Sequence, residues 1–362
     1  MNKRILVFSF AYYPFVGGAE VAIKEITDRL KDFEFDLLTH SFDNSLPTKE
    51  KIGNVTVIRI RSFTKFLYPI KSFLKASRLH FKNRYDLSWA VMANTGFASL
   101  FLKLFFGLPF ILTIQEGDPI PQIKRRVWFV YPFFKMVFKM ADKVTAISVF
   151  LADFAREMGA KNISVIPNGV DLEIFVGQPK TISDSKNAVL ITTSRLVKKN
   201  GLADVIQALP LLPVGVTFSI LGDGPLLDEL KELSLKLNVS DRVNFMGFVR
   251  HEKAVDLLRS ADVFIRPSLT EGLGCSFLEA MSVGLPLIAT PVGGIPDFLK
   301  DGETGLFCDV NNPKDIADKV LRLMNDKELY KKISKNGVEI VREKYDWNGI
   351  SSRFASIFSS VS

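Results

Sequence analysis

Short apolar runs recur along this chain, and each is followed by a polar turn and then a segment with helical spacing of apolar residues. Continuous apolar strands that alternate with helices are typical of parallel sheets covered by helices on both faces. The pattern stops near Asp171 and restarts at Val189, and 362 residues suit two domains at about 100–200 residues each. We therefore predict two α/β domains, each built on a doubly wound parallel sheet. The predicted strands are Ile5–Phe10, Phe35–Thr39, Val55–Ile60, Phe110–Ile114 and Lys143–Ile147, then Val189–Thr193, Val216–Leu221, Val243–Met246, Val263–Arg266 and Leu287–Thr290.

The polar segment 177–187, which contains Gly, Pro and Ser, is the predicted linker between the two domains. In open α/β sheets ligands bind beyond the carboxyl ends of the strands, and two facing domains form a cleft between them. The residues that directly follow each predicted strand are therefore the candidates for a functional site.

No segment is predicted to enter a membrane as a helix. The run from Phe97 to Ile114 comes nearest, but Lys103, Gly107 and Pro109 interrupt it, and a spanning helix needs about 20 uninterrupted apolar residues. We predict a helix, a Gly-Leu-Pro break and a buried strand there. The N-terminus is expected to form a strand, since no small-residue cleavage site of a signal peptide follows it.

The positive charge lies in the first half of the chain. Residues 1–170 contain 24 basic and 14 acidic residues, a net charge of +10, whereas residues 171–362 contain 23 and 25, a net charge of −2. A basic half suits nucleic acid, an anionic membrane surface or a phosphorylated ligand. Cys275 and Cys308 are too few for a disulfide framework or a zinc site, so we expect a reducing, cytoplasmic compartment.

The most informative stretch runs from Arg266 to Met281. A predicted strand ends, a glycine-rich loop follows, and a helix begins near Ser276, whose N-terminal amides would accept a diphosphate. Glu271 in the loop and Glu279 a turn into the helix are eight residues apart, so they would reach different parts of one elongated ligand. A capping glutamate and a solvated glutamate are the alternative, although a capping box needs closer spacing.

Other polar or glycine-rich turns follow other predicted strands. Arg195 follows Val189–Thr193, and an arginine there would neutralise phosphate oxygens with a two-pronged hydrogen bond. The pair Gly17-Gly18 precedes a helix, but it does not form the G-x-G-x-x-G fingerprint of dinucleotide binding, which disfavours a dehydrogenase. Further glycine turns are Gly222-Asp-Gly-Pro225 and Pro291-Val-Gly-Gly-Ile-Pro-Asp297. Together these turns favour one shared ligand-binding rim.

The sequence resembles the retaining glycosyltransferases of family 4, which have the GT-B fold. The resemblance covers nearly the whole chain and rests on the order of the motifs, which also include Ile166-Pro-Asn-Gly-Val-Asp171. It implies two facing Rossmann-like domains with a cleft between them. Residues 1–170 would hold the acceptor, residues 171–344 would hold the nucleotide-sugar donor, and a C-terminal helix over residues 345–362 would pack back on the first domain.

Carried over residue by residue, the resemblance also implies a role for each part of the site. Arg195 and a nearby lysine would clamp the donor diphosphate, Glu279 would hold the ribose, and Glu271 would address the sugar. The implied catalytic residues are Glu271, Arg195, Lys199 and Glu116, and the implied donor-binding residues are Gly17, Gly18, Gly222, Phe248, Val249, Gly272, Leu273, Gly274, Cys275, Ser276 and Glu279. The donor would be a UDP-sugar or a GDP-sugar, with no other cofactor and no metal.

Two positions depart from the family pattern. The family usually has a histidine after the strand that here ends at Ile114, whereas this chain has Gln115-Glu-Gly-Asp118, and which of these replaces the histidine stays open. The family lysine before glycine aligns with Asn200, so the phosphate-binding lysine is Lys199 or Lys198. Because the sequence offers no carboxylate cluster for a divalent metal, we expect cations and helix amides to stabilise the leaving diphosphate.

An acceptor is indicated by basic segments with interleaved aromatic residues. The stretch from Arg59 to Arg84 contains eight basic residues and no acid, and Lys124-Arg-Arg126 precedes a second such segment. Cations beside aromatic rings suit contact with an anionic membrane leaflet or docking of a lipid-linked acceptor. Two core-packed helices with solvated lysines are the alternative, and nothing in the sequence matches a nucleic-acid-binding module.

The leading hypothesis is therefore a peripheral-membrane glycosyltransferase that moves a hexosyl unit to a glycan or a lipid-linked acceptor. A nucleotide-sugar 2-epimerase of the same fold and an inactive membrane-associated scaffold are the alternatives, and donor-dependent turnover separates the three. Glu271 and Glu279 argue for the transferase, because the epimerases do not usually show this pair.

Overall fold

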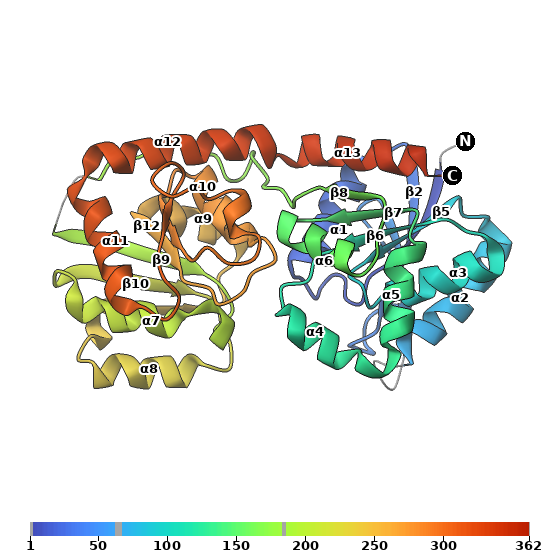
Figure 1. The fold of residues 1–362 in the computed structure, drawn as a ribbon, viewed down its shortest axis with the longest axis horizontal. Helices are drawn as coiled ribbons and strands as arrows, with labels where there is room; N and C mark the ends of the chain where they lie inside the picture. The colour runs from blue at the N-terminus through green and yellow to red at the C-terminus, as the bar shows by residue number, and fades with distance from the viewer. Residues whose placement is uncertain (1–2, 62–66, 183–185, 362) are drawn as a thin grey trace. The chain divides into compact units, whose positions relative to one another are not determined.

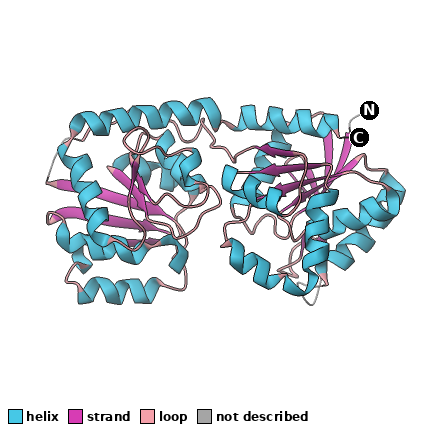
Figure 2. Ribbon diagram, viewed as in Figure 1, coloured by secondary structure: helices cyan, strands magenta, loops and turns pink. Residues whose placement is uncertain are grey.

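The computed structural model describes residues 3–61, 67–182 and 186–361, and it divides into two compact units. Unit 1 comprises residues 1–168 together with 347–362, and unit 2 comprises residues 169–346. Each unit is a parallel sheet with helices on both faces (Figure 2). The chain therefore has two α/β units, as the repeated strand-helix pattern predicts.

The sheet of unit 1 has the strand order β3-β4-β2-β1-β5-β6-β7-β8, and only β3 runs antiparallel, against β4. The chain reverses its direction of winding between β1 and β5, which is the switch point where such sheets bind ligands. Figure 1 labels β2, β5, β6, β7 and β8 of this sheet. The strands are β1 (Lys3–Phe8), β2 (Phe33–His40), β3 (Lys49–Ile52), β4 (Val55–Ile60), β5 (Leu87–Val91), β6 (Phe110–Ile114), β7 (Lys143–Ala146) and β8 (Ile163–Val165).

Alternate side chains of the unit 1 strands enter two separate cores. In β1, Ile5 and Val7 pack with α1 and α13, whereas Leu6 and Phe8 pack with α2 and α3. This alternation follows from the two-residue period of a strand, which sends successive side chains to opposite faces. The helices are α1 (Gly18–Arg29), α2 (Tyr68–Asn83), α3 (Gly96–Phe106), α4 (Ile120–Arg126), α5 (Tyr131–Met140), α6 (Val149–Glu157) and α13 (Trp347–Ser360).

Unit 2 has the strand order β11-β10-β9-β12-β13-β14, with every pairing parallel. Winding reverses between β9 and β12, so this pair marks the switch point of the second sheet. The strands are β9 (Asn187–Thr193), β10 (Gly215–Leu221), β11 (Val243–Gly247), β12 (Val263–Arg266), β13 (Leu287–Ala289) and β14 (Leu306–Phe307). The helices are α7 (Leu202–Ala208), α8 (Leu227–Lys236), α9 (His251–Ser260), α10 (Cys275–Ser282), α11 (Pro313–Asn325) and α12 (Lys327–Lys344).

The run from Phe97 to Ile114 forms the predicted helix, break and strand. Helix α3 ends at Phe106, Gly107 caps it with a left-handed φ of 69°, and β6 begins at Phe110. Glycine reaches this backbone conformation without the steric cost that a side chain would add. Among the described residues, no helix combines the length and the apolar character that crossing a membrane requires.

The predicted linker 177–187 is wrong as a linker, because its described residues belong to unit 2. The Lys180 ammonium donates to the carbonyl oxygens of Arg259 and Ala261 at 2.5 and 2.8 Å, and Ile182 is buried in the core. The unit boundary instead follows Asn168. A polar composition suggested a loop, but it did not reveal that the loop is fastened to the second sheet. Residues 183–185 lie outside the described part of the chain.

The last helix, α13, belongs to unit 1 although the 178 residues of unit 2 precede it. Its Phe358 ring is fully buried and lies 5.3 Å from the Trp89 ring and 6.0 Å from the Phe35 ring, measured between ring centroids. At the end of the helix the Lys3 ammonium donates to the carbonyl oxygens of Phe358, Ser359 and Val361. The first strand and the last helix of the chain are thus joined within unit 1.

Substituting Phe358 with alanine is expected to lower the free energy of unfolding of unit 1 by about 3–5 kcal/mol, because the cavity it leaves lies between α13 and the sheet. Denaturant titration followed by tryptophan fluorescence measures this, since Trp89, Trp128 and Trp347 all belong to unit 1. Phe105→Ala is the control, because that ring is 69% exposed. Equal losses in the two variants would contradict the assigned packing of α13.

Candidate active site

The residues predicted for the donor site gather at the carboxyl edge of the unit 2 sheet. Arg195 follows β9, Gly222 follows β10, Phe248 follows β11, and the loop 267–274 follows β12. Because all these strands are parallel, their carboxyl ends meet at one edge, which is where open α/β sheets bind ligands. Within unit 2, the structure therefore brings the predicted motifs to one rim.

Glu271 is held at its backbone and at both carboxylate oxygens. Its carbonyl oxygen accepts a hydrogen bond from the Gly294 amide at 3.1 Å, and its Oε1 accepts one from the Gly272 amide at 3.0 Å. Gly293 makes this approach possible, since a Cβ there would lie 1.8 Å from the Glu271 carbonyl oxygen. Gly293 also has a φ of 58°, which a side chain would strain. The Gly293-Gly294 turn thus fixes the Glu271 loop.

The second carboxylate oxygen of Glu271 binds an arginine that the sequence analysis did not select as a site residue. Arg266 Nη2 donates to Glu271 Oε2 at 2.8 Å, and the two side chains are only 6% and 14% exposed. Burial lowers the pKa of the Arg266 guanidinium, and the Glu271 carboxylate opposes that shift. An arginine at the end of an apolar strand was the available signal, since the other three residues of β12 are apolar and all four are buried.

The Arg195 loop is braced by the residue that replaces the family lysine. Asn200 is buried, and its Nδ2 donates to the Arg195 carbonyl oxygen at 2.6 Å. The Lys199 carbonyl oxygen accepts from the Leu269 amide at 2.7 Å, which joins this loop to the one after β12. The Arg195 side chain is exposed and makes no hydrogen bond or ion pair with any residue that the structure describes. Its guanidinium is therefore available to a ligand.

Helix α10 begins at Cys275, one residue before the predicted start, and Gly274 precedes it with a φ of 86°. Its first turn contains no acid, so the amide groups there face no competing carboxylate from their own turn. Leu273 is buried, while Cys275, Ser276 and Glu279 are partly exposed. The loop thus presents helix amides beside one anchored and one partly exposed carboxylate, Glu271 and Glu279.

Several buried hydroxyl groups at this rim lack a hydrogen-bond partner among the described residues. They are on Thr192, Thr193 and Ser194 at the end of β9 and on Ser268 after β12. Buried polar atoms are nearly always paired in folded proteins, so a local group of unpaired ones needs an explanation. Ordered water is the usual partner of buried polar atoms that have none within the protein.

The turns after β10 and β11 contain the remaining predicted residues of unit 2. The Gly222 amide donates to the Gly247 carbonyl oxygen at 2.8 Å, which ties the two turns together. Phe248 is 84% exposed, and Val249 beside it is partly buried. An aromatic face open to solvent at the ligand edge offers a stacking surface for a flat ring.

In unit 1, the predicted Gly17 and Gly18 form the start of α1. The Gly17 amide donates to Glu20 Oε2 at 2.8 Å, and Glu20 is buried. Burial raises the pKa of the Glu20 carboxyl, and its backbone hydrogen bonds oppose the rise. Both glycines are exposed and follow β1, so they lie at the carboxyl edge of the unit 1 sheet.

Glu116 follows β6 at the same edge of unit 1 and is buried, with 7% of the residue exposed. Its Oε1 accepts from the Ala93 amide at 2.7 Å, and its Oε2 has no hydrogen-bond partner within the described residues. Burial raises the pKa of the Glu116 carboxyl. The neighbouring Gln115 accepts through Oε1 from Asn168 Nδ2 at 3.2 Å. Glu116 therefore fixes the turn after β5, and Gln115 contacts Asn168, where the first segment of unit 1 ends.

Comparison with protein families identifies the chain. The family model described as Glycosyltransferase Family 4 matches residues 16–174, and that of Glycosyl transferases group 1 matches residues 177–339. An Escherichia coli enzyme, UDP-Gal:alpha-D-GlcNAc-diphosphoundecaprenol alpha-1,3-galactosyltransferase, is 30% identical over 363 residues, 91% of this chain and 90% of its own. The chain belongs to the group 1 glycosyltransferases. The predicted family and enzyme class are confirmed.

Solved structures support the fold of this glycosyltransferase. Sucrose-phosphate synthase from Thermosynechococcus elongatus is similar with a TM-score of 0.85 and 20% identity, covering 99% of this chain and 98% of its own. HepE of Anabaena, solved with UDP and glucose, is similar with a TM-score of 0.81 and 21% identity over 99% and 100% of the two chains. The predicted GT-B fold is therefore confirmed.

Unit 1 of the glycosyltransferase exposes apolar side chains on basic helices. Helices α2, α3 and α5 pack side by side, and the sequences of α2, α3, α4 and α5 contain no Asp or Glu. We use the name basic aromatic surface for the cations of these helices together with the exposed apolar side chains on and between them. Its apolar members, each at least half exposed, are Ile70, Leu74, Phe81, Leu104, Phe105, Trp128, Phe129 and Phe133. Phe63, Lys65 and Phe66, also part of the predicted basic stretch, lie outside the described residues.

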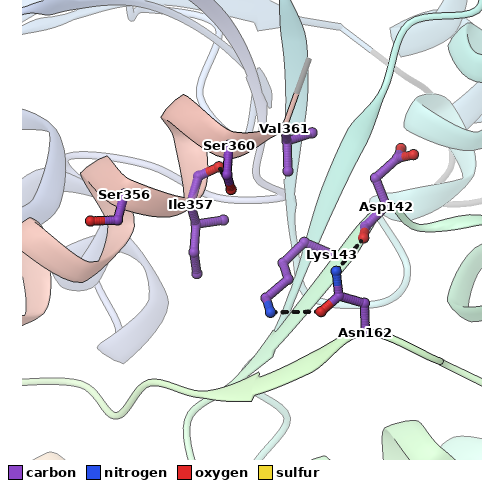
Figure 3. A pocket seen from close by; sticks show the side chains of 7 residues that line it. All are labelled: Asp142, Lys143, Asn162, Ser356, Ile357, Ser360 and Val361. Atoms are coloured by element: carbon purple, nitrogen blue, oxygen red, sulfur yellow. Dashed lines mark hydrogen bonds between the residues drawn. The ribbon is translucent and has the colours of Figure 1, made fainter.

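A surface pocket of about 560 Å³ in unit 1 lies away from the predicted site. Figure 3 shows its lining, in which Lys143 Nζ donates to Asn162 Oδ1 at 2.7 Å. Lys143 begins β7 and Asn162 precedes β8, so this pocket is at the amino edge of the sheet, opposite the carboxyl edge. Among the described residues, no group of three or more His, Cys, Asp or Glu side chains is arranged to hold a metal ion.

Proposed function

We propose that this glycosyltransferase moves a hexosyl unit from a UDP-sugar or a GDP-sugar to a glycan or lipid-linked acceptor, with retention at the anomeric carbon and without a metal ion. The observation that carries the proposal is the unit 2 rim, where the unpaired Arg195 side chain, the start of α10 and the anchored Glu271 follow neighbouring strands. Arg195 and Lys199 would bind the diphosphate, because guanidinium and ammonium groups pair with phosphate oxygens.

The proposed reaction proceeds on one face of the sugar. The bond between the anomeric carbon and the diphosphate oxygen breaks, and its electron pair goes to the diphosphate. The acceptor hydroxyl forms the new bond to the anomeric carbon on the same face, and its proton goes to the leaving phosphate oxygen. Arg195, Lys199 and the amides of residues 273–276 would stabilise the negative charge that develops on the diphosphate, since the Gly272 amide already donates to Glu271 Oε1.

The rest of the donor would extend over the neighbouring turns of unit 2. Glu279, partly exposed on α10, would accept hydrogen bonds from the ribose hydroxyls, and Glu271 would address the sugar. Phe248 would stack against the base beside Val249 and Gly222, because its ring is exposed at the end of β11. In unit 1, Gly17 and Gly18 would approach the donor, and Glu116 would lie beside the reacting sugar.

We propose a lipid-linked acceptor because two observations favour it. The Escherichia coli relative acts on a diphosphoundecaprenol-linked sugar, according to its name. The basic aromatic surface of unit 1 combines exposed rings with helices that contain cations and no acid, which suits a peripheral contact with the anionic inner face of the cell membrane. Three of these cations, Lys103, Lys124 and Arg126, already pair with Asp142, Glu157 and Asp118.

Trp128→Ala/Phe129→Ala is expected to weaken binding to phosphatidylglycerol-containing vesicles by about tenfold or more, because the two rings, 74% and 54% exposed, would bury that apolar area in the bilayer surface. Vesicle sedimentation measures the bound fraction, and vesicles of pure phosphatidylcholine test the charge requirement. Leu211→Ala/Val214→Ala is the control, since these side chains are equally exposed in unit 2. Undiminished binding of the Trp128/Phe129 variant would exclude this surface as the membrane contact.

The transfer itself is tested by incubating the protein with labelled UDP-glucose, UDP-N-acetylglucosamine or GDP-mannose, EDTA and lipid-linked acceptors. The proposal predicts a glycosylated lipid whose formation requires one donor and one acceptor, with the anomeric configuration of the donor preserved in its NMR coupling. Release or isomerisation of the sugar without any acceptor would contradict it and favour an epimerase.

A further inference from the structure

Arg266, at the carboxyl end of β12, contacts three different elements at the carboxyl edge of the unit 2 sheet, which we call the donor rim. Its Nη1 donates to Ser276 Oγ at 2.8 Å and to the Thr193 carbonyl oxygen at 3.2 Å, and its Nη2 donates to Glu271 Oε2 at 2.8 Å. Its guanidinium carbon lies 4.2 Å from the centroid of the Phe277 ring. One side chain therefore joins the end of β9, the Glu271 loop and the first turn of α10.

This arrangement is not explained by stability alone. A buried ion pair loses its hydration on folding, and replacing such a pair with apolar residues of similar volume is often neutral or stabilising. Arg266 is 5% exposed, and its Nε has no hydrogen-bond partner among the residues that the structure describes. The loop is also shaped around the guanidinium, since a Cβ at Gly274 would lie 2.9 Å from Nη2.

Arg242 shows what a buried arginine with only a structural role looks like in the same unit. It is 8% exposed, and it donates to the carbonyl oxygens of Val216 and Pro213, both at 2.9 Å. These partners lie at the start of β10, at the amino edge of the sheet. Arg242 thus holds backbone at the edge opposite the donor rim, whereas Arg266 holds the side chains of Glu271 and Ser276.

We propose that Arg266 is a positioning residue for sugar transfer, which fixes the Glu271 carboxylate in the orientation that the reaction uses. The planar guanidinium donates to Glu271 through Nη2 while its Nη1 holds Ser276 and the Thr193 carbonyl oxygen, a fixed geometry that the ammonium of lysine does not have. The inference rests on the proposed donor site, and it adds a residue that acts through Glu271 and does not itself touch the sugar.

The test is Arg266→Lys, which keeps the charge and removes the planar fork. We expect kcat to fall by about 10²-fold, because a small misplacement of the reacting groups costs about that much in rate. The donor KM and the affinity for the nucleoside diphosphate should change by less than about threefold, because the diphosphate is bound by Arg195 and the α10 amides, which remain. Arg242→Lys is the matched control. We expect its kcat to stay near that of the parent even if its thermal stability falls.

A double variant, compared with Glu271→Gln alone, tests whether Arg266 acts through Glu271. Arg266→Met/Glu271→Gln removes both charges, so no buried charge is left unpaired and the fold is kept. We expect its kcat to be within about threefold of that of Glu271→Gln alone, since residues that act as a unit are not additive. Thermal unfolding and diphosphate binding of each variant verify that the protein is folded.

Three outcomes would overturn the proposal. Arg266→Lys could turn over like the parent, Arg242→Lys could lose as much kcat as Arg266→Lys, or Arg266→Met/Glu271→Gln could lose far more kcat than Glu271→Gln alone. These results are distinct from failure of the proposed function, in which the parent protein itself binds no nucleoside diphosphate and transfers no sugar.

Discussion

Glu271→Gln is expected to lower kcat by about 10²–10³, the usual cost of removing one group that stabilises charge in a transition state. In the structure both Glu271 oxygens accept hydrogen bonds, Oε1 from the Gly272 amide and Oε2 from Arg266. A glutamine would turn its amide group toward one of these donors, so one hydrogen bond is lost and the Arg266 charge is left unpaired. Steady-state kinetics with the preferred donor measure the effect.

Nucleoside diphosphate binding should be nearly unchanged in this variant, because the diphosphate contacts are assigned to Arg195, Lys199 and the α10 amides. Glu339→Gln is the control, since Glu339 is exposed on α12 and its carboxylate pairs, within the described part of the chain, only with Lys335 at 3.8 Å. If Glu271→Gln turned over like the parent, or if it lost diphosphate affinity as strongly as it lost kcat, Glu271 would not be the residue that addresses the sugar.

Arg195→Ala is expected to weaken both binding and turnover. Hydrogen bonds to a charged group contribute about 1.5–3 kcal/mol, so diphosphate affinity should fall by about 10–100-fold. The rate should fall by about 10²–10³ because the charge on the leaving diphosphate develops during the reaction. The variant should unfold at the same temperature as the parent, since the Arg195 guanidinium has no partner among the described residues to lose.

Arg322→Ala is the matched control for Arg195, because Arg322 is also exposed in unit 2 and makes no hydrogen bond through its side chain to a described residue. It lies in the last turn of α11. Titration calorimetry and initial rates on both variants separate a specific phosphate contact from a general loss of positive charge. Comparable effects in Arg322→Ala would show that only the net charge of unit 2 matters.

The fold was predictable where a strand is an uninterrupted apolar run. The predicted Val55–Ile60, Phe110–Ile114 and Val263–Arg266 match β4, β6 and β12 residue for residue. The strand β5 was missed although it lies beside β1, because it is short and the polar Ser88 interrupts its apolar run. The polar atoms of Ser88 and Trp89 are paired with residues distant in sequence, Ser99 and Thr113, which no local pattern shows.

Strands at the edges of the sheets were missed because they are short or lack an apolar run. The strand β3 consists of Lys49–Ile52, lies at the end of the sheet and runs antiparallel to β4, so it needs no apolar run. The strands β8 and β14 have only three and two residues. The expectation of a purely parallel sheet therefore holds for unit 2 and fails at one edge of unit 1.

The candidate site was predictable as a set of motifs but not as a network. Strand ends followed by glycine turns placed Arg195, Gly222 and Glu271 correctly at one edge of unit 2. The brace from Asn200 to the Arg195 carbonyl oxygen and the ion pair of Arg266 with Glu271 were not foreseen. Both depend on how a side chain folds back on a neighbouring loop, which spacing in the sequence does not specify.

The measurement that most directly tests the central claim is a calorimetric titration of the purified protein with UDP, GDP and ADP in turn, in the presence of EDTA. The account predicts that one of the three binds tightly without metal and that Arg195→Ala weakens this binding while Arg322→Ala does not. Absence of binding by all three diphosphates, or binding that Arg195→Ala leaves unchanged, would contradict the assignment of the unit 2 rim as the donor site.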